Sequence, residues 1–159
     1  MRLQVEWSRP IRLRDVRKHA DQNMVYEADL EKFARVPGVY IFGRIFGAQL
    51  EALYVGKATK IRGRIRSQFN NSRLMQHILN AKNGKRVVLA GALLTRRGQQ
   101  LKKSLALAEK ALIRHFVSEG HDLVNVSGVR IRRHELASSG RHPKKFFPEI
   151  VYLEKTKGD

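Results

Sequence analysis

One carboxylate in this sequence falls among apolar residues that repeat with helical spacing. A helix is predicted over residues 99–118, and Glu109 lies on its apolar stripe, whose members are Leu101, Leu105, Ala108, Leu112 and Phe116. An ionised carboxylate in apolar surroundings is costly unless it pairs with a cation or binds a metal. Glu109 is therefore predicted either to hold a hard cation such as Mg²⁺, with water and phosphate oxygens, or to pair with a nearby arginine. The pattern alone leaves both open.

A second group of reactive side chains lies between residues 38 and 69. Tyr40 and Tyr54 fall on two predicted strands, Lys57 follows the second strand, and a basic helix comes next with Lys60, Arg62, Arg64 and Arg66. Tyrosines are ordinary sheet residues, and the basic helix could be a solvated face or a set of generic phosphate contacts. Other chemistry has no support, because the sequence lacks zinc-site histidine spacing, a Walker or dinucleotide loop and a G-x-S-x-G motif.

The two tyrosines are positioned by a hairpin whose strands are predicted over 38–46 and 50–56. A three-residue loop, Gly47-Ala48-Gln49, would place Phe42 opposite Tyr54 and Tyr40 diagonally beside Tyr54 on one face. A two-residue loop would place the tyrosines on opposite faces.

Helices are predicted over 58–69 and 72–82, and a central strand buried on both faces over 86–95. The first helix has an apolar stripe of Ile61, Ile65 and Phe69, with Lys57, Arg64 and Gln68 along one edge. Gly63 inside this helix costs up to about 1 kcal/mol relative to alanine. It could allow another backbone or a phosphate to approach closely, and the sequence does not decide which.

The two ends of the chain are predicted to be extensions of a core over 37–128. Residues 1–36 should pack on this core, with a strand at Leu3–Trp7 and a short helix at Leu30–Arg35 that Asp29 caps. Residues 129–159 form a basic extension, irregular to about residue 148, with an edge strand near 149–153. Its Phe146 and Phe147 are interpreted as core residues, or alternatively as wedges between bases.

The composition favours a nucleic acid as partner. The 159 residues include 32 lysines and arginines against 14 acids, a formal charge of +18. Such a surplus repels itself in a compact chain and is typical of proteins that bind a polyanion, although a membrane surface or solubility alone could explain it. The absence of cysteine excludes disulfides and thiolate chemistry. No apolar run reaches about 18 residues and the start lacks a signal-peptide core, so we expect a soluble cytoplasmic protein without a membrane partner.

Five of these elements, taken in order, resemble the GIY-YIG nucleases. They are Gly38-Val39-Tyr40, Tyr54-Val55-Gly56-Lys57, Arg64, Glu109 and Asn125. The two tripeptides are conservative variants of those that name the family. The local likeness extends to the N-terminal nuclease domain of the bacterial excision-repair incision subunit. The resemblance covers about residues 37–128.

The resemblance implies an α+β fold, with a small three-stranded antiparallel sheet flanked by helices in the order β-β-α-α-β-α. It also implies a DNA endonuclease that uses one Mg²⁺ or Mn²⁺ ion per site and leaves 5′-phosphate and 3′-hydroxyl ends. Carried over, Glu109 would be the metal ligand, and Arg64 would bind the scissile phosphate and stabilise its developing charge. Tyr40 and Tyr54 would orient or deprotonate the attacking water.

Further roles follow from the same resemblance and from the charge. Asn125 would support the geometry of the site, and Lys57 would lower the pKa of a tyrosine or contact phosphate. The remaining predicted substrate contacts are Gly56, Lys60, Arg62, Arg66, Arg141, Lys144 and Lys145.

Two features depart from the family. Gln68 stands where many members carry tyrosine or histidine, and Asn125 follows Glu109 after a long gap.

We therefore expect a stand-alone endonuclease of the restriction or mobile-element type, because the chain has no room for the further domains of a repair subunit. A palindromic double-strand cutter would be expected to form a homodimer. Two alternatives remain: a catalytically silent module with the same fold that binds nucleic acid, which Gln68 favours, and a structural RNA-binding protein, which only the charge favours.

Overall fold

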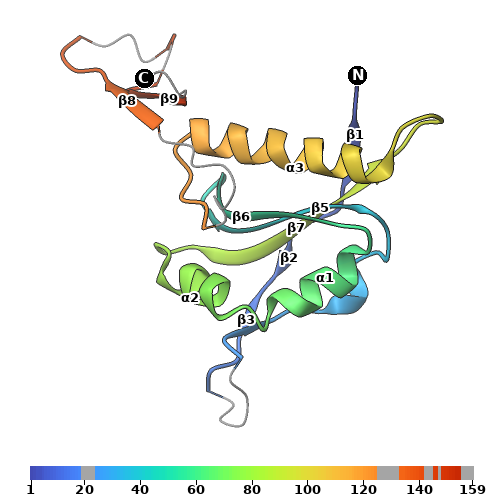
Figure 1. Cartoon of the computed structure of the whole chain (residues 1–159). Helices are drawn as coiled ribbons and strands as arrows, with labels where there is room; N and C mark the ends of the chain where they lie inside the picture. Colours follow the sequence, from blue (N-terminus) through green and yellow to red (C-terminus); the bar gives the residue numbers. More distant parts are fainter. Residues whose placement is uncertain (19–23, 125–132, 142–144, 147, 155–159) are drawn as a thin grey trace.

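The computed structural model describes residues 1–18, 24–124, 133–141, 145–146 and 148–154. Its elements in chain order are β1 (Gln4–Trp7), β2 (Ile11–Arg12), β3 (Arg14–Asp15), β4 (Tyr26–Glu27), the 3₁₀ helix η1 (Leu30–Lys32), β5 (Gly38–Phe46), β6 (Gln49–Ala58), α1 (Ile61–Gln68), α2 (Ser72–Asn80), β7 (Lys85–Leu94), α3 (Leu101–Ser118), β8 (Arg133–Ala137) and β9 (Ile150–Glu154). The α+β class predicted from the sequence is confirmed (Figure 1).

The main sheet is antiparallel and has five strands where the resemblance implied three. Its order is β1-β7-β5-β6, and β2 also pairs with β7. The expected strands β5, β6 and β7 are present, with β7 in the interior of the sheet. The additional pairs, such as Gln4 with Leu94 and Ile11 with Val88, come from the first 36 residues. The N-terminal segment therefore supplies strands to the sheet.

Helices cover both faces of this sheet, with α1 and α2 on one side and α3 on the other (Figure 1). The alternation of β5 divides its side chains between two cores. Tyr40 and Phe42 pack with residues of α1 and α2, including Ile65. Ile41 packs with residues of α3, including Ile113. Because β6 is the end strand of the order, one edge of the sheet lies between the two helical layers.

The hairpin of β5 and β6 has a two-residue loop, so the predicted three-residue loop is wrong. Phe46 pairs with Gln49 across this loop, yet Phe42 still pairs with Tyr54. The register shifts between these pairs because β6 contains one extra residue, Leu53, as a β-bulge. A bulge changes which face the following side chains occupy. It therefore returns Tyr54 to the face of Tyr40, as the longer loop would have done.

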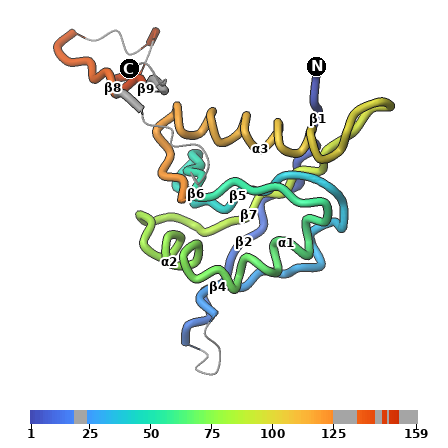
Figure 2. The backbone as a smooth tube through the Cα atoms, viewed as in Figure 1, coloured from blue at the N-terminus to red at the C-terminus, as the bar shows by residue number. Residues whose placement is uncertain are grey.

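Two expectations near the ends of the chain need correction. The predicted helix at Leu30–Arg35 is only a 3₁₀ turn, although Asp29 caps it by accepting a hydrogen bond from the Glu31 amide. The stretch expected to be irregular contains β8, which pairs with β9 in a separate two-stranded sheet. Strand β9 contacts α3, at the end of this helix away from β1 (Figure 2). Core packing is wrong for Phe146, which is exposed, and Phe147 lies outside the described residues.

Candidate active site

Two tyrosines and one glutamine meet on the α1 side of the sheet. Tyr40 is buried and Tyr54 half-buried, and their rings stack with centroids 6.0 Å apart and planes 24° apart. The buried side chain of Gln68, the last residue of α1, donates from Nε2 to the Tyr40 hydroxyl at 2.7 Å and to the Tyr54 hydroxyl at 3.0 Å. A primary amide carries two N–H groups, so one glutamine can serve both phenols.

The orientation of Gln68 is set by the N-cap of the next helix. Asn71 caps α2, and its Oδ1 accepts from the Leu74 amide at 3.1 Å. Its Nδ2 is then directed to Gln68 Oε1, to which it donates at 3.1 Å. With Oε1 engaged as acceptor, the Gln68 amide nitrogen faces the phenols. The cap of α2 therefore orders the tyrosine pair.

The glycines of both sequence motifs leave room for close packing. A Cβ on Gly56 would lie 2.4 Å from both the hydroxyl and Cζ of Tyr40. A Cβ on Gly38 would lie 2.0 Å from the carbonyl oxygen of Gly91 and 2.6 Å from Cδ1 of Ile61. Real Cβ atoms do not approach so closely, which explains the residue type at both positions. Gly56, a predicted substrate contact, is buried in the structure beneath the Tyr40 ring.

Burial raises the pKa of the Tyr40 phenol well above its ordinary value. The hydrogen bond from Gln68 and the charge of Arg64 act in the opposite direction, and the neighbouring Tyr54 raises the pKa further. Desolvation is the largest of these effects, because a buried phenolate loses its hydration. Tyr40 is therefore a neutral phenol at physiological pH and a poor candidate for a general base.

Arg64 lies on the exposed surface of α1, one turn before Gln68. Burial raises the pKa of the Tyr40 phenol, and the charge of Arg64 acts on it in the lowering direction as the smallest of the effects there. Within the part of the chain that the structure describes, its guanidinium has no carboxylate or hydrogen-bond partner. An exposed guanidinium without a carboxylate partner is well suited to bind a phosphate.

Glu109 pairs with Lys57 across the α3 side of the sheet. Lys57 Nζ donates to Glu109 Oε2, and the side chains are 42% and 20% exposed, respectively. The sequence left an arginine ion pair and a metal as alternatives for this carboxylate. The cation found beside Glu109 is a lysine of β6. This ion pair is enough to explain why a carboxylate lies on the apolar stripe of α3.

A metal would have to use the other oxygen of Glu109. Within the described residues Oε1 makes no ion pair or hydrogen bond, and a carboxylate oxygen suits Mg²⁺. No three Asp, Glu, His or Cys side chains gather anywhere in this described part, so side chains of these types form no cage there. The single carboxylate fits a cation that takes its other ligands from water and phosphate.

The predicted site residues thus form two clusters that flank the β6 edge. Tyr40, Tyr54 and Gln68 lie on the α1 side, where the charge of Arg64 acts on Tyr40. Lys57 and Glu109 lie on the α3 side, because side chains alternate along β6 and Val55 packs with α3. The structure brings the members of each cluster into contact. Both clusters adjoin the same edge of the sheet.

The remaining predicted contacts are scattered. Arg62 is used internally: its Nε donates to the Phe33 carbonyl at 2.7 Å, and its guanidinium pairs with Glu31 at 3.3 Å. Lys60, the N-cap residue of α1, and Arg66 within α1 are exposed, and the C-terminal positions Arg141 and Lys145 are also exposed. Asn125 and Lys144 lie outside the described residues.

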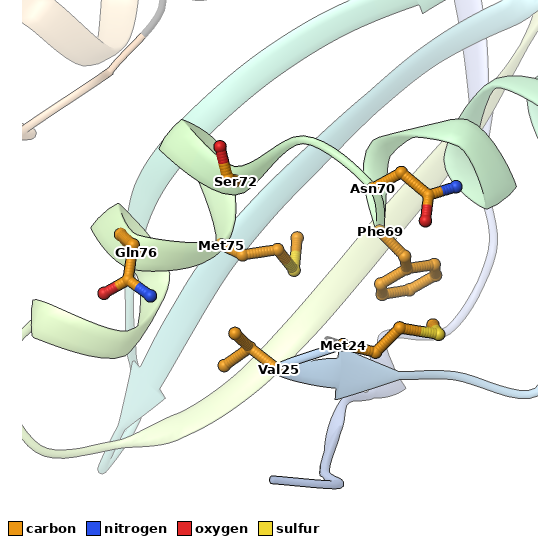
Figure 3. Close-up of a pocket in the computed structure, with 7 residues that line it drawn as sticks. All are labelled: Met24, Val25, Phe69, Asn70, Ser72, Met75 and Gln76. Atoms are coloured by element: carbon orange, nitrogen blue, oxygen red, sulfur yellow. The ribbon is translucent and has the colours of Figure 1, made fainter. Parts of the chain in front are cut away.

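Sequence reasoning missed two features around the site. It treated Gln68 as a departure and did not foresee the link through Asn71, although an asparagine directly before Ser72 is a typical helix-cap signal. It also did not foresee a hollow of about 530 Å³ between α1, α2 and the segment before η1, lined by Met24, Val25, Phe69, Asn70, Ser72, Met75 and Gln76 (Figure 3). None of the predicted site residues lines this hollow.

No protein-family model, curated protein or solved structure matches this chain. Among the described residues, no helix has the length and apolar character needed to cross a membrane. The function must therefore be inferred from the chain's own residues.

Proposed function

We propose that this chain is a divalent-metal-dependent DNA endonuclease of the GIY-YIG type, which leaves 5′-phosphate and 3′-hydroxyl ends. The observation that carries the proposal is that residues far apart in the sequence form two clusters, one on each face of the sheet beside its end strand β6. These are the tyrosine pair, the exposed Arg64 and the ion-paired Glu109. The charge of +18 supports a polyanionic substrate.

In this proposal Arg64 binds the scissile phosphate and stabilises the charge that develops on it, and within the described residues no carboxylate competes for it. Glu109 would hold Mg²⁺ or Mn²⁺ through the carboxylate oxygen that Lys57 does not contact, with water and phosphate as the other ligands. When bound, such a cation polarises the phosphate and stabilises developing negative charge. Lys57 fixes the position of the Glu109 carboxylate beside β6 through their ion pair.

The two tyrosines have different roles. Tyr40 is buried and its pKa is raised, so it holds its neighbours in place as a neutral phenol. Tyr54 is half-buried and is the phenol of the pair that solvent can reach. We therefore assign to Tyr54 the orientation of the attacking water or, in its phenolate form, the acceptance of the water's proton. Gln68 holds this hydroxyl in position.

A catalytically silent nucleic-acid-binding module is the second candidate. The observation in its favour is that Gln68 occupies a hydrogen-bond position on each phenol and has no proton to exchange near neutral pH. Lys57 also contacts the carboxylate that a metal would need. On this alternative the chain binds DNA through Arg64 and the other cations without cutting it.

Supercoiled plasmid incubated with Mg²⁺ or Mn²⁺ tests the proposal. The wild-type protein should give nicked or linear products, and labelled ends should prove to be 5′-phosphate and 3′-hydroxyl. Arg64→Ala should lower the rate by about 10²-fold or more. Arg73→Ala removes an equal charge from the exposed surface of α2 and should retain activity. Tight binding without cleavage, on plasmid and on branched DNA, would favour the silent module.

A further inference from the structure

A basic hollow on α1 lies away from the tyrosines. It has a volume of about 230 Å³ and is lined by Arg35, Lys60, Arg62, Gly63 and Arg66. We propose that this basic hollow binds a second phosphate of duplex DNA, one other than the scissile phosphate. The inference deepens the proposed function, since it takes DNA as the ligand.

Three of the four cations in the basic hollow are available to a ligand. Arg35, Lys60 and Arg66 are exposed, and within the described residues their side chains make no ion pair or hydrogen bond. The acid nearby, Glu31, is engaged with Arg62. Cations gathered without their own carboxylates repel one another, and an anion relieves that repulsion.

The basic hollow is a built feature, because the segment that carries Arg35 is tied to α1 on both sides of it. The Ile61 amide donates to the Val36 carbonyl at 3.0 Å, and the Arg62 amide donates to the Ala34 carbonyl at 3.3 Å. Arg62 adds its side-chain bond to the Phe33 carbonyl. Arg62, which sequence reasoning assigned to the substrate, thus positions the other cations.

Gly63 supports the presence of an external ligand. A Cβ added there would meet no protein atom within 4 Å, so packing among the described residues does not require glycine. Glycine inside a helix is nevertheless unfavourable relative to alanine. A phosphate that approaches the helix backbone closely in the basic hollow would account for the missing side chain.

The geometry of α1 separates this ligand from the scissile phosphate. Arg62 and Arg66 are four residues apart and share a flank of the helix. Arg64 is two residues from each, about 200° away around the axis. A helix with its side chains is about 10 Å across, so one phosphate cannot contact both flanks. The basic hollow therefore holds a different phosphate and helps to fix the position of DNA along α1.

The test measures the affinity for a fluorescently labelled duplex over a series of salt concentrations. The double variant Arg35→Ala/Arg66→Ala should reduce the slope of log K against log salt by about one, the value for one lost phosphate contact. The control Arg73→Ala/Arg97→Ala removes the same charge from exposed positions outside the basic hollow. It should change the slope by less than about half as much. Equal slopes for the two double variants would overturn the proposal.

Gly63→Ala provides a second, independent readout. It should leave the thermal unfolding midpoint unchanged or raised, because alanine favours the helix. It should also weaken DNA binding roughly fivefold by blocking the approach to the backbone. Unchanged affinity would contradict the role of Gly63 in the basic hollow.

Plasmid cleavage measured on the same proteins separates this inference from the proposed function. If the wild type cuts and the double variants have equal slopes, the second phosphate site is wrong and the endonuclease stands. If the wild type binds without cutting and the slopes differ as expected, the site stands and the endonuclease is wrong.

Discussion

Replacing Gly56 by alanine should destabilise the protein through a clash with Tyr40. The added Cβ would lie 2.4 Å from the Tyr40 hydroxyl and Cζ and 2.9 Å from Cε1. The ring is buried and stacks on Tyr54, so it cannot move aside freely. Overpacking of a core costs about 1–3 kcal/mol, and a displaced hydrogen bond to Gln68 costs about 1 kcal/mol more. We therefore expect unfolding to become easier by about 2–4 kcal/mol.

Urea unfolding followed by circular dichroism measures this cost. With a slope of about 2 kcal/mol per molar, the midpoint should fall by about 1–2 M. Gly63→Ala is the matched control, because the same change meets open space there and should stabilise by up to about 1 kcal/mol. In a Tyr40→Phe background, which removes one of the clashing atoms, Gly56→Ala should cost less. A Gly56→Ala midpoint equal to that of the wild type would refute the packing argument.

Three further predictions concern the tyrosine pair and a half-buried histidine. Gln68→Leu removes both hydrogen bonds to the phenols and should lower the free energy of unfolding in urea by about 1–3 kcal/mol, because the hydroxyl of buried Tyr40 loses this donor. A loss no larger than that for an exposed hydrogen bond would contradict this prediction. Tyr54→Phe should lower single-turnover cleavage by about 10²-fold or more, whereas Tyr40→Phe should mainly reduce stability; the reverse order would exchange the two roles. His121 Nδ1 accepts from the Ala52 amide at 2.8 Å, and burial holds the pKa of His121 below its ordinary value of 6.5. As the pH falls, His121 is therefore protonated in the unfolded chain before it is protonated in the folded one. The free energy of unfolding should keep its full value above about pH 6.5 and decrease at lower pH. His121→Gln should make this pH dependence weaker.

Strong periodic patterns predicted the elements that carry the site. The stripe of Ile61, Ile65 and Phe69 is buried along α1 and its C-cap, and the apolar run of β7 lies inside the sheet, as expected. The partner of the N-terminal strand was not predictable, because its pairing of Gln4 with Leu94 spans most of the described core. Alternation within a strand gives no information about such a distant partner.

In the hairpin of β5 and β6, the predicted loop length was wrong but the predicted pairing of Phe42 with Tyr54 was correct. The loop is shorter than predicted, and the bulge at Leu53 compensates for the missing residue. The bulged residue, Leu53, is not a glycine, and the glycine at the register shift, Gly43, lies on the partner strand β5, so the sequence of β6 itself gave no signal for the bulge. The face of Tyr54 was therefore predicted correctly, but its cause is the bulge and not the three-residue loop that the sequence suggested.

The contacts inside the site depended on tertiary packing. The sequence identified Glu109 as a misplaced charge and left an arginine or a metal as its partner, because it grouped Lys57 with Arg64 and Gln68 along the predicted helix; Lys57 instead lies in β6, on the α3 side of the sheet. Gln68 looked like a lost ring, and only the structure shows the amide joining both phenols. Hydrogen-bond partners on neighbouring elements leave no periodic trace in a sequence.

The most direct test of the central claim is plasmid cleavage by Glu109→Gln compared with the wild type. This variant keeps the size of the side chain and removes the charge that would hold a metal. Glu119→Gln, at the end of the same helix, is the matched control. We predict that wild type and Glu119→Gln cut with Mg²⁺ or Mn²⁺, and that Glu109→Gln binds DNA equally well but cuts at least about 10²-fold more slowly. Equal cleavage by wild type and Glu109→Gln would contradict the account.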